Sequence, residues 1–147
     1  MASLLEVAPK IDSMRTMKQS TPWLLSGAIF GFIGVALGAF GAHGLAEALE
    51  ARQATAIWKT AVQYQMWHAL GLILLSLLER EDPPLRGVGF AFCIGILIFS
   101  GTLYGIGLGG PRWLGAITPL GGLALLIGWL LLARAAVIRP NHRQNNP

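Results

Sequence analysis

The sequence predicts an all-α integral membrane protein, a four-helix bundle with a short interfacial amphipathic helix between spans one and two. Of its 147 residues, 54% are hydrophobic and only 12% are charged, against about 25% charged in ordinary soluble domains. The apolar residues form four runs, each long enough as a helix to cross a hydrocarbon core of roughly 30 Å. The charged residues lie mainly in the tails and connectors.

These runs divide the chain into one membrane domain and two tails. We expect an N-terminal tail over residues 1–22, a membrane domain over residues 23–137 and a C-terminal tail over residues 138–147. Within the membrane domain the spans are expected at about residues 23–42, 60–78, 88–108 and 113–137.

The first apolar run could be a membrane span or a signal peptide, because Arg15 and Lys18 precede it and Ala39-Phe40-Gly41 resembles a cleavage site. Its uncharged run exceeds the roughly 7–15 residues of a signal peptide, which favours a membrane anchor. Five glycines of this span fall within an arc of roughly 80° on a helical wheel, at spacings that permit close helix crossing in lipid. We expect a helix-packing seam formed by Gly27, Gly31, Gly34, Gly38 and Gly41.

Residues 44–59 mix acidic, basic and apolar side chains, a pattern that predicts an amphipathic helix lying at one membrane face and running into span two. Trp58 is expected at the level of the lipid headgroups, where tryptophan is enriched. Span two then ends at the charged, proline-containing turn of residues 79–84.

Span two carries the most unusual polar residues of the chain. Tyr64, Gln65 and His68 lie within an arc of roughly 100°, while Gln63 points away from them. A polar side chain turned to lipid without a partner costs free energy, so this face is expected to point into the bundle or a wet cavity. Span three adds hydroxyl groups in its second half. The candidate intramembrane polar site is Tyr64, Gln65, His68, Ser100 and Tyr104.

His68 is the member of this set with the most possible chemical roles. A membrane histidine can bind metal or haem, transfer a proton, or accept a hydrogen bond from a neighbour such as Tyr104 or Ser100. We favour an interhelical hydrogen-bond cluster, because such bonds are common in membranes. Contact with a ligand, lipid or quinone, proton or ion transfer, and a redox metal are the alternatives. Haem ligation with His43 is disfavoured, since His43 is expected near the interface and His68 deeper.

The remaining sequence motifs do not predict a catalytic, metal or cofactor site. The chain has a single cysteine, Cys93, and no zinc or hydrolase motif, so no catalytic residue, metal or cofactor is expected. The glycine pattern of residues 105–110 resembles a dinucleotide site but ends a membrane span and follows no strand. The Lys and Arg residues form no contiguous basic stripe, which argues against a nucleic-acid partner.

Charge predicts the orientation. Four spans place both termini on one side with the connector between spans two and three. That side carries eight of the 11 Lys and Arg residues, so the positive-inside rule predicts cytoplasmic termini. The opposite side carries Arg52, Lys59 and Arg112.

Four stretches resemble a known family: GAFGAHGL at 38–45, WKTAVQYQMWHALGLILL at 58–75, FSGTLYGIGL at 99–108 and GAITPLGGLALLIGWLLL at 115–132. Together they are similar to the small multi-pass membrane proteins of domain-of-unknown-function family 423, which includes bacterial YgdD-like proteins. The resemblance implies four helices in a cytoplasmic-type (bacterial inner) membrane and no assigned catalytic residue. Trp67 stands where that family usually has tyrosine, which removes a hydroxyl beside His68.

The leading functional hypothesis is a non-enzymatic scaffold or accessory subunit that packs in the lipid bilayer with another membrane protein or with itself. The alternative is a protein that binds or transports a small molecule, lipid or quinone at the candidate polar site. A third hypothesis is an oxidoreductase subunit that uses haem or quinone.

Overall fold

The computed structural model describes residues 22–78 and 85–138, and within these ranges it contains helices and no strand. The predicted helical class and the four long helices are therefore confirmed. The helices are α2 (Pro22–Ala42), α3 (Ala46–Ala51), α4 (Thr55–Leu78), α5 (Arg86–Gly107) and α6 (Leu114–Ile138). The tails, the 79–84 turn and their basic residues lie outside the described residues.

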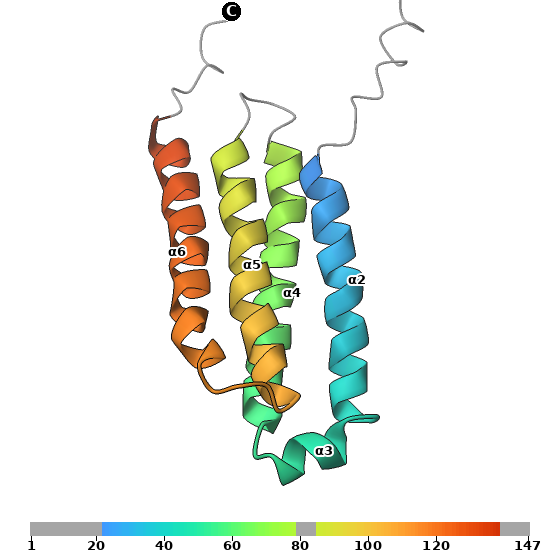
Figure 1. The fold of residues 1–147 in the computed structure, drawn as a ribbon. Helices are drawn as coiled ribbons and strands as arrows, with labels where there is room; N and C mark the ends of the chain where they lie inside the picture. The colour runs from blue at the N-terminus through green and yellow to red at the C-terminus, as the bar shows by residue number, and fades with distance from the viewer. Residues whose placement is uncertain (1–21, 79–84, 139–147) are drawn as a thin grey trace, which may run out of the picture.

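The four long helices run side by side, with α4 and α5 in the centre (Figure 1). α2 packs mainly against α4, and α6 packs mainly against α5. The start of α2, the end of α6 and the facing ends of α4 and α5 lie at one end of the bundle, whereas α3 lies at the other (Figure 1). This is the up-and-down order that short connectors between antiparallel spans require.

Each long helix has the length and hydropathy to cross a membrane. The helices bury only part of this apolar surface against one another, and large side chains such as Phe32, Leu97 and Leu130 remain more than half exposed. In lipid these side chains meet hydrocarbon instead of water, so their exposure costs nothing. α4 is the most buried of the four spans. The protein is thus a membrane bundle organised around α4.

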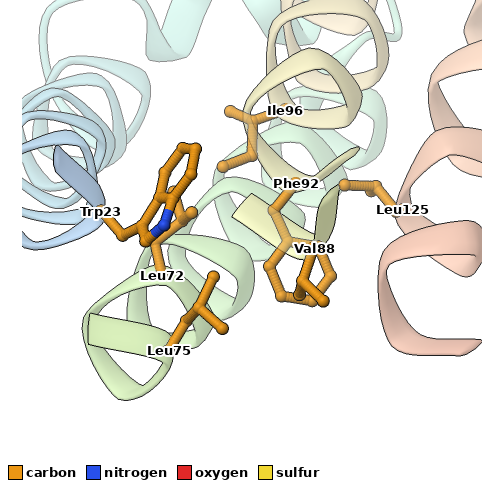
Figure 2. Packing of buried hydrophobic residues seen from close by; sticks show 7 residues of the cluster. All are labelled: Trp23, Leu72, Leu75, Val88, Phe92, Ile96 and Leu125. Atoms are coloured by element: carbon orange, nitrogen blue, oxygen red, sulfur yellow. The ribbon is translucent and has the colours of Figure 1, made fainter. Parts of the chain in front are cut away.

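The main core cluster joins all four spans and is centred on Phe92, which is fully buried (Figure 2). A Cβ at Gly71 of α4 would lie 3.2 Å from the Phe92 ring, and one at Gly128 of α6 would lie 2.5 Å from it. The Phe92 ring therefore fits between two helices only because both have glycine there. The cluster consists of Trp23, Leu72, Leu75, Val88, Phe92, Ile96 and Leu125.

The glycine face of α2 meets α4 at four of the five predicted seam positions. Cβ atoms added at Gly27, Gly34, Gly38 and Gly41 would each lie against α4 atoms, including the Ala69 carbonyl oxygen at 2.8 Å from Gly27. Gly31 differs, because no heavy atom lies within 4 Å of its Cβ position. The close approach of α2 and α4 thus uses every seam glycine except Gly31.

The segment between α2 and α4 differs from its prediction in length. α3 has six residues, and the chain turns at Gln53, where φ is 55° and the Ala54 amide donates to the Leu49 carbonyl. α4 therefore begins at Thr55, five residues earlier than span two was predicted to begin. The reason is the burial of Leu49 and Ala54, which folds α3 back onto the bundle instead of letting a longer helix lie along the membrane.

Trp58, expected at the level of the lipid headgroups, is buried, with 3% of its surface exposed. Its indole N–H donates to the Leu37 carbonyl of α2 at 3.0 Å, and its ring lies edge-on to Tyr104 of α5 with 4.8 Å between centroids. Trp58 therefore joins three helices inside the bundle.

Replacing Gly27 with alanine should lower the free energy of unfolding by about 1–3 kcal/mol, because its methyl group would meet the backbone of α4. Gly31→Ala is the matched control on the same helix, since its methyl group meets open space. Denaturation of the two variants in detergent would measure this difference. Equal stability of the two variants would contradict the described α2–α4 contact.

Candidate functional site

Gln65 is buried on α4 and forms hydrogen bonds to two other helices. Its amide nitrogen donates to the Phe30 carbonyl of α2 at 2.8 Å, and its amide oxygen accepts from the Tyr104 hydroxyl of α5 at 3.0 Å. Gly34 lies beside this side chain: a Cβ there would lie 3.4 Å from the amide nitrogen and only 2.7 Å from the sulfur of Met66. One amide thus uses both of its ends to link three spans.

Ser100 adds a second bond between α5 and α4. It is almost completely buried, and its hydroxyl donates to the Ala61 carbonyl at 2.9 Å. Gln65 and Tyr104 bond to each other, whereas Ser100 bonds separately to a backbone carbonyl, so the three side chains are satisfied within the bundle. None of the three lines a described cavity. This part of the candidate site has the character of an interhelical hydrogen-bond cluster.

His68 is also buried on α4 but faces a different neighbour. Its Nδ1 lies 2.8 Å from the Tyr64 carbonyl, and its Nε2 lies 3.0 Å from the indole nitrogen of Trp129 on α6. A carbonyl only accepts and an indole N–H only donates. The contacts therefore assign the proton to Nδ1 and the lone pair to Nε2, which makes His68 a neutral imidazole with both nitrogens bonded.

A cavity of about 580 Å³ lies beside this pair, between α4, α5 and α6. We call it the aromatic groove, because five of its lining residues carry aromatic or imidazole rings. Its outer lining residues, including Trp67 and Leu126, are exposed, so the groove opens toward lipid. The groove is lined by Tyr64, Trp67, His68, Phe99, Pro119, Gly122, Leu123, Leu125, Leu126 and Trp129.

Tyr64 lines the groove with its ring against Phe99, at 4.6 Å between centroids. Its hydroxyl makes no hydrogen bond within the described part of the chain. The structure divides the five predicted residues between two places. Tyr64 and His68 line the aromatic groove, whereas Gln65, Ser100 and Tyr104 form hydrogen bonds between helices.

Trp129 is the residue that the sequence analysis missed. It is 44% exposed and provides the only described hydrogen bond from another helix to His68. An indole N–H near the middle of an apolar span is a polar group that needs an acceptor, and this signal could have identified it. Counting tryptophan only as a hydrophobic residue hides that requirement.

The structure separates His68 from the other candidate ligand, His43. His43 follows the last residue of α2, where the neighbouring Gly41 meets Trp58 of α4. His68 lies ten residues farther along α4 than Trp58, about 15 Å. The two imidazoles are therefore too far apart to bind one haem iron. Within residues 22–78 and 85–138 no group of three or more His, Cys, Asp or Glu is placed to hold a metal ion.

Comparison with known proteins assigns the family. Residues 37–122 match the family described as protein of unknown function, DUF423. The chain belongs to this family. A UPF0382 membrane protein of Staphylococcus epidermidis is 40% identical over 78% of this chain and 94% of its own length. The UPF0382 membrane protein YwdK of Bacillus subtilis is 42% identical over 78% of this chain and 95% of its own length.

A UPF0382 membrane protein of Schizosaccharomyces pombe is 37% identical over 69% of this chain and 90% of its own length. No solved structure matches this chain. The DUF423 match includes all five predicted polar residues and ends before Trp129. The family description assigns no function to this DUF423 protein.

Tyr104→Phe should lower the free energy of unfolding by about 0.6–2 kcal/mol, because it removes the hydroxyl that donates to the buried Gln65 amide. Tyr64→Phe is the matched control, since the Tyr64 hydroxyl has no partner in the described residues and its loss should change stability little. Unfolding in mixed detergent micelles, followed by circular dichroism, would compare the variants. A larger loss for Tyr64→Phe would contradict this assignment of partners.

Proposed function

We propose that the protein binds an uncharged hydrophobic molecule from the bilayer in the aromatic groove. The observation that supports this proposal is the groove itself, a cavity of about 580 Å³ that opens toward lipid and is lined mainly by aromatic and aliphatic side chains. Binding sites for small molecules have volumes of about 300–1,000 Å³ and this kind of lining, with few polar groups.

Depth and charge limit the class of molecule. His68 lies 13 residues from the start of α4 and ten from its end, or about 20 and 15 Å, which is near the middle of a membrane span. No charged side chain lines the groove, and a charged group at this depth is costly. The ligand is therefore a neutral molecule with a long hydrocarbon part.

Tyr64 defines the polar end of this molecule. Tyr64 lines the groove, and its hydroxyl makes no hydrogen bond within residues 22–78 and 85–138, whereas both nitrogens of His68 are already bonded. A single carbonyl or hydroxyl oxygen on the ligand would satisfy Tyr64. Quinones and neutral isoprenoid or acyl lipids have this chemistry.

Gly122→Leu should empty the groove of its ligand. A Cβ at Gly122 would lie 3.6 Å from the Phe99 ring, so alanine would fit and the longer leucine would extend into the cavity. Gly101→Leu is the matched control, because it adds the same side chain at an exposed glycine with no neighbour within 4 Å. Mass spectrometry of neutral lipids that co-purify with each protein would measure occupancy.

We expect the unmodified protein and Gly101→Leu to carry the same neutral molecule near one per chain, and Gly122→Leu to carry at least fivefold less. Thermal unfolding of Gly122→Leu would verify that it is folded. Full occupancy in folded Gly122→Leu, or no enriched neutral molecule in the unmodified protein, would contradict the proposal.

A second role, as an accessory subunit that packs with another membrane protein or with itself, is favoured by Gly31. No neighbouring heavy atom lies within 4 Å of its Cβ position, which leaves room for a helix of another chain to approach α2 closely. The proteins purified for the lipid measurement also test this accessory role. A co-purifying protein or a dimer would support it, and a strictly monomeric protein without a co-purifying partner would contradict it.

We also infer that the protein resides in a bacterial cytoplasmic (inner) membrane with both termini in the cytoplasm. The bacterial membrane location is supported by two bacterial membrane proteins that are about 40% identical to this chain. The second part is supported by the eight Lys and Arg residues assigned to the terminal side, against three on the other.

A further inference from the structure

A second cavity lies at the opposite end of the bundle from the start of α2 and the end of α6, between α2, α3 and α4, with a volume of about 410 Å³. We call it the interfacial pocket. Unlike the aromatic groove, it carries a charged residue and two other polar side chains. It is lined by Gly38, Gly41, Ala42, Leu49, Thr55, Trp58, Lys59, Val62 and Gln63.

The three polar residues form one line along α4. Thr55, Lys59 and Gln63 are spaced four residues apart, and this spacing places them on one face of the helix. Their side chains lean toward the start of α4, because Cα–Cβ bonds tilt toward the helix N-terminus. Lys59 and Gln63 are exposed and make no hydrogen bond or ion pair within the described residues.

The pocket changes in character with depth. Lys59 lies about 6 Å and Gln63 about 12 Å along α4 from Thr55, its first residue. Beside them Gly38 and Gly41 of α2 have no side chain, and a Cβ at Gly38 would lie 3.4 Å from Val62. From the membrane surface inward, the pocket therefore presents the Lys59 cation, then the Gln63 amide, and then an apolar gap between two helices.

We propose that the interfacial pocket binds one anionic phospholipid. The lipid has the same order of groups: a phosphate at the surface, ester carbonyls below it and acyl chains in the hydrocarbon. The Lys59 ammonium pairs with the phosphate, the Gln63 amide donates to an ester carbonyl, and an acyl chain lies along Gly38 and Val62. The acidic residues of α3, Glu47 and Glu50, are exposed and do not line the pocket, so they leave the charge of Lys59 available.

Native mass spectrometry of the full chain in detergent would test this with phosphatidylglycerol and phosphatidylcholine of identical acyl chains. We expect tighter binding of phosphatidylglycerol. Lys59→Gln should weaken phosphatidylglycerol binding about fivefold, the effect of one basic residue near a lipid surface, and leave phosphatidylcholine binding unchanged. Arg112→Gln is the matched control, because Arg112 is exposed in the α5–α6 connector and does not line the pocket.

Three outcomes would overturn the proposal: equal binding of the two lipids by the unmodified protein, equal effects of Lys59→Gln and Arg112→Gln, or displacement of phosphatidylglycerol by an equal concentration of inorganic phosphate. The last would show that the pocket recognises a free anion and not a lipid. Lys59 is exposed, so thermal unfolding should be the same for the unmodified protein and Lys59→Gln. The aromatic groove is not altered by either variant, which keeps this test separate from the proposed function.

Discussion

A polar side chain inside a membrane must find its partners within the protein, and this constraint is concentrated on α4. Gln65 and His68 are both buried near the middle of this helix, where no water is available to satisfy them. Gln65 meets the requirement through α2 and α5, and His68 meets it through α6. The positions of the other three spans are therefore tied to two side chains of the central helix. Interhelical hydrogen bonds of this kind contribute modestly to stability, yet they are directional and specify which faces meet.

Close packing then completes the arrangement on one side of α4 and leaves space on the other. The glycines of α2 bring its backbone against α4, whereas α6 packs mainly on α5 and reaches α4 through the indole of Trp129. The aromatic groove lies in the space between these helices. The indole that donates to His68 thus also lines the cavity beside it. Occupancy of this groove by a neutral lipid would replace contacts that α6 does not provide.

The sequence was sufficient for the four spans, because uncharged runs of membrane length have no other stable environment. It was less informative about which neighbouring helix each polar side chain of α4 contacts. The helical wheel placed Tyr64, Gln65 and His68 on one face, but an arc of roughly 100° faces two different neighbours, and only the three-dimensional arrangement assigns Gln65 to α2 and α5 and His68 to α6. The contacts of Trp58 and Trp129 could not be predicted for a related reason: each indole N–H donates to an acceptor on another helix, and sequence periodicity contains no information about that acceptor. The length of α3 depended on where Leu49 is buried, which is also a tertiary effect.

The bond between Trp129 and His68 is the most direct test of this account. Nitrogen-15 solid-state NMR in lipid bilayers would report the protonation of each imidazole nitrogen, with His43 and His142 replaced by glutamine so that His68 is the only histidine of the original three. The account predicts a neutral imidazole with the proton on Nδ1, and a change in the Nε2 chemical shift when Trp129 is replaced by phenylalanine. A proton on Nε2, or an Nε2 shift that is unaffected by loss of the indole, would contradict it.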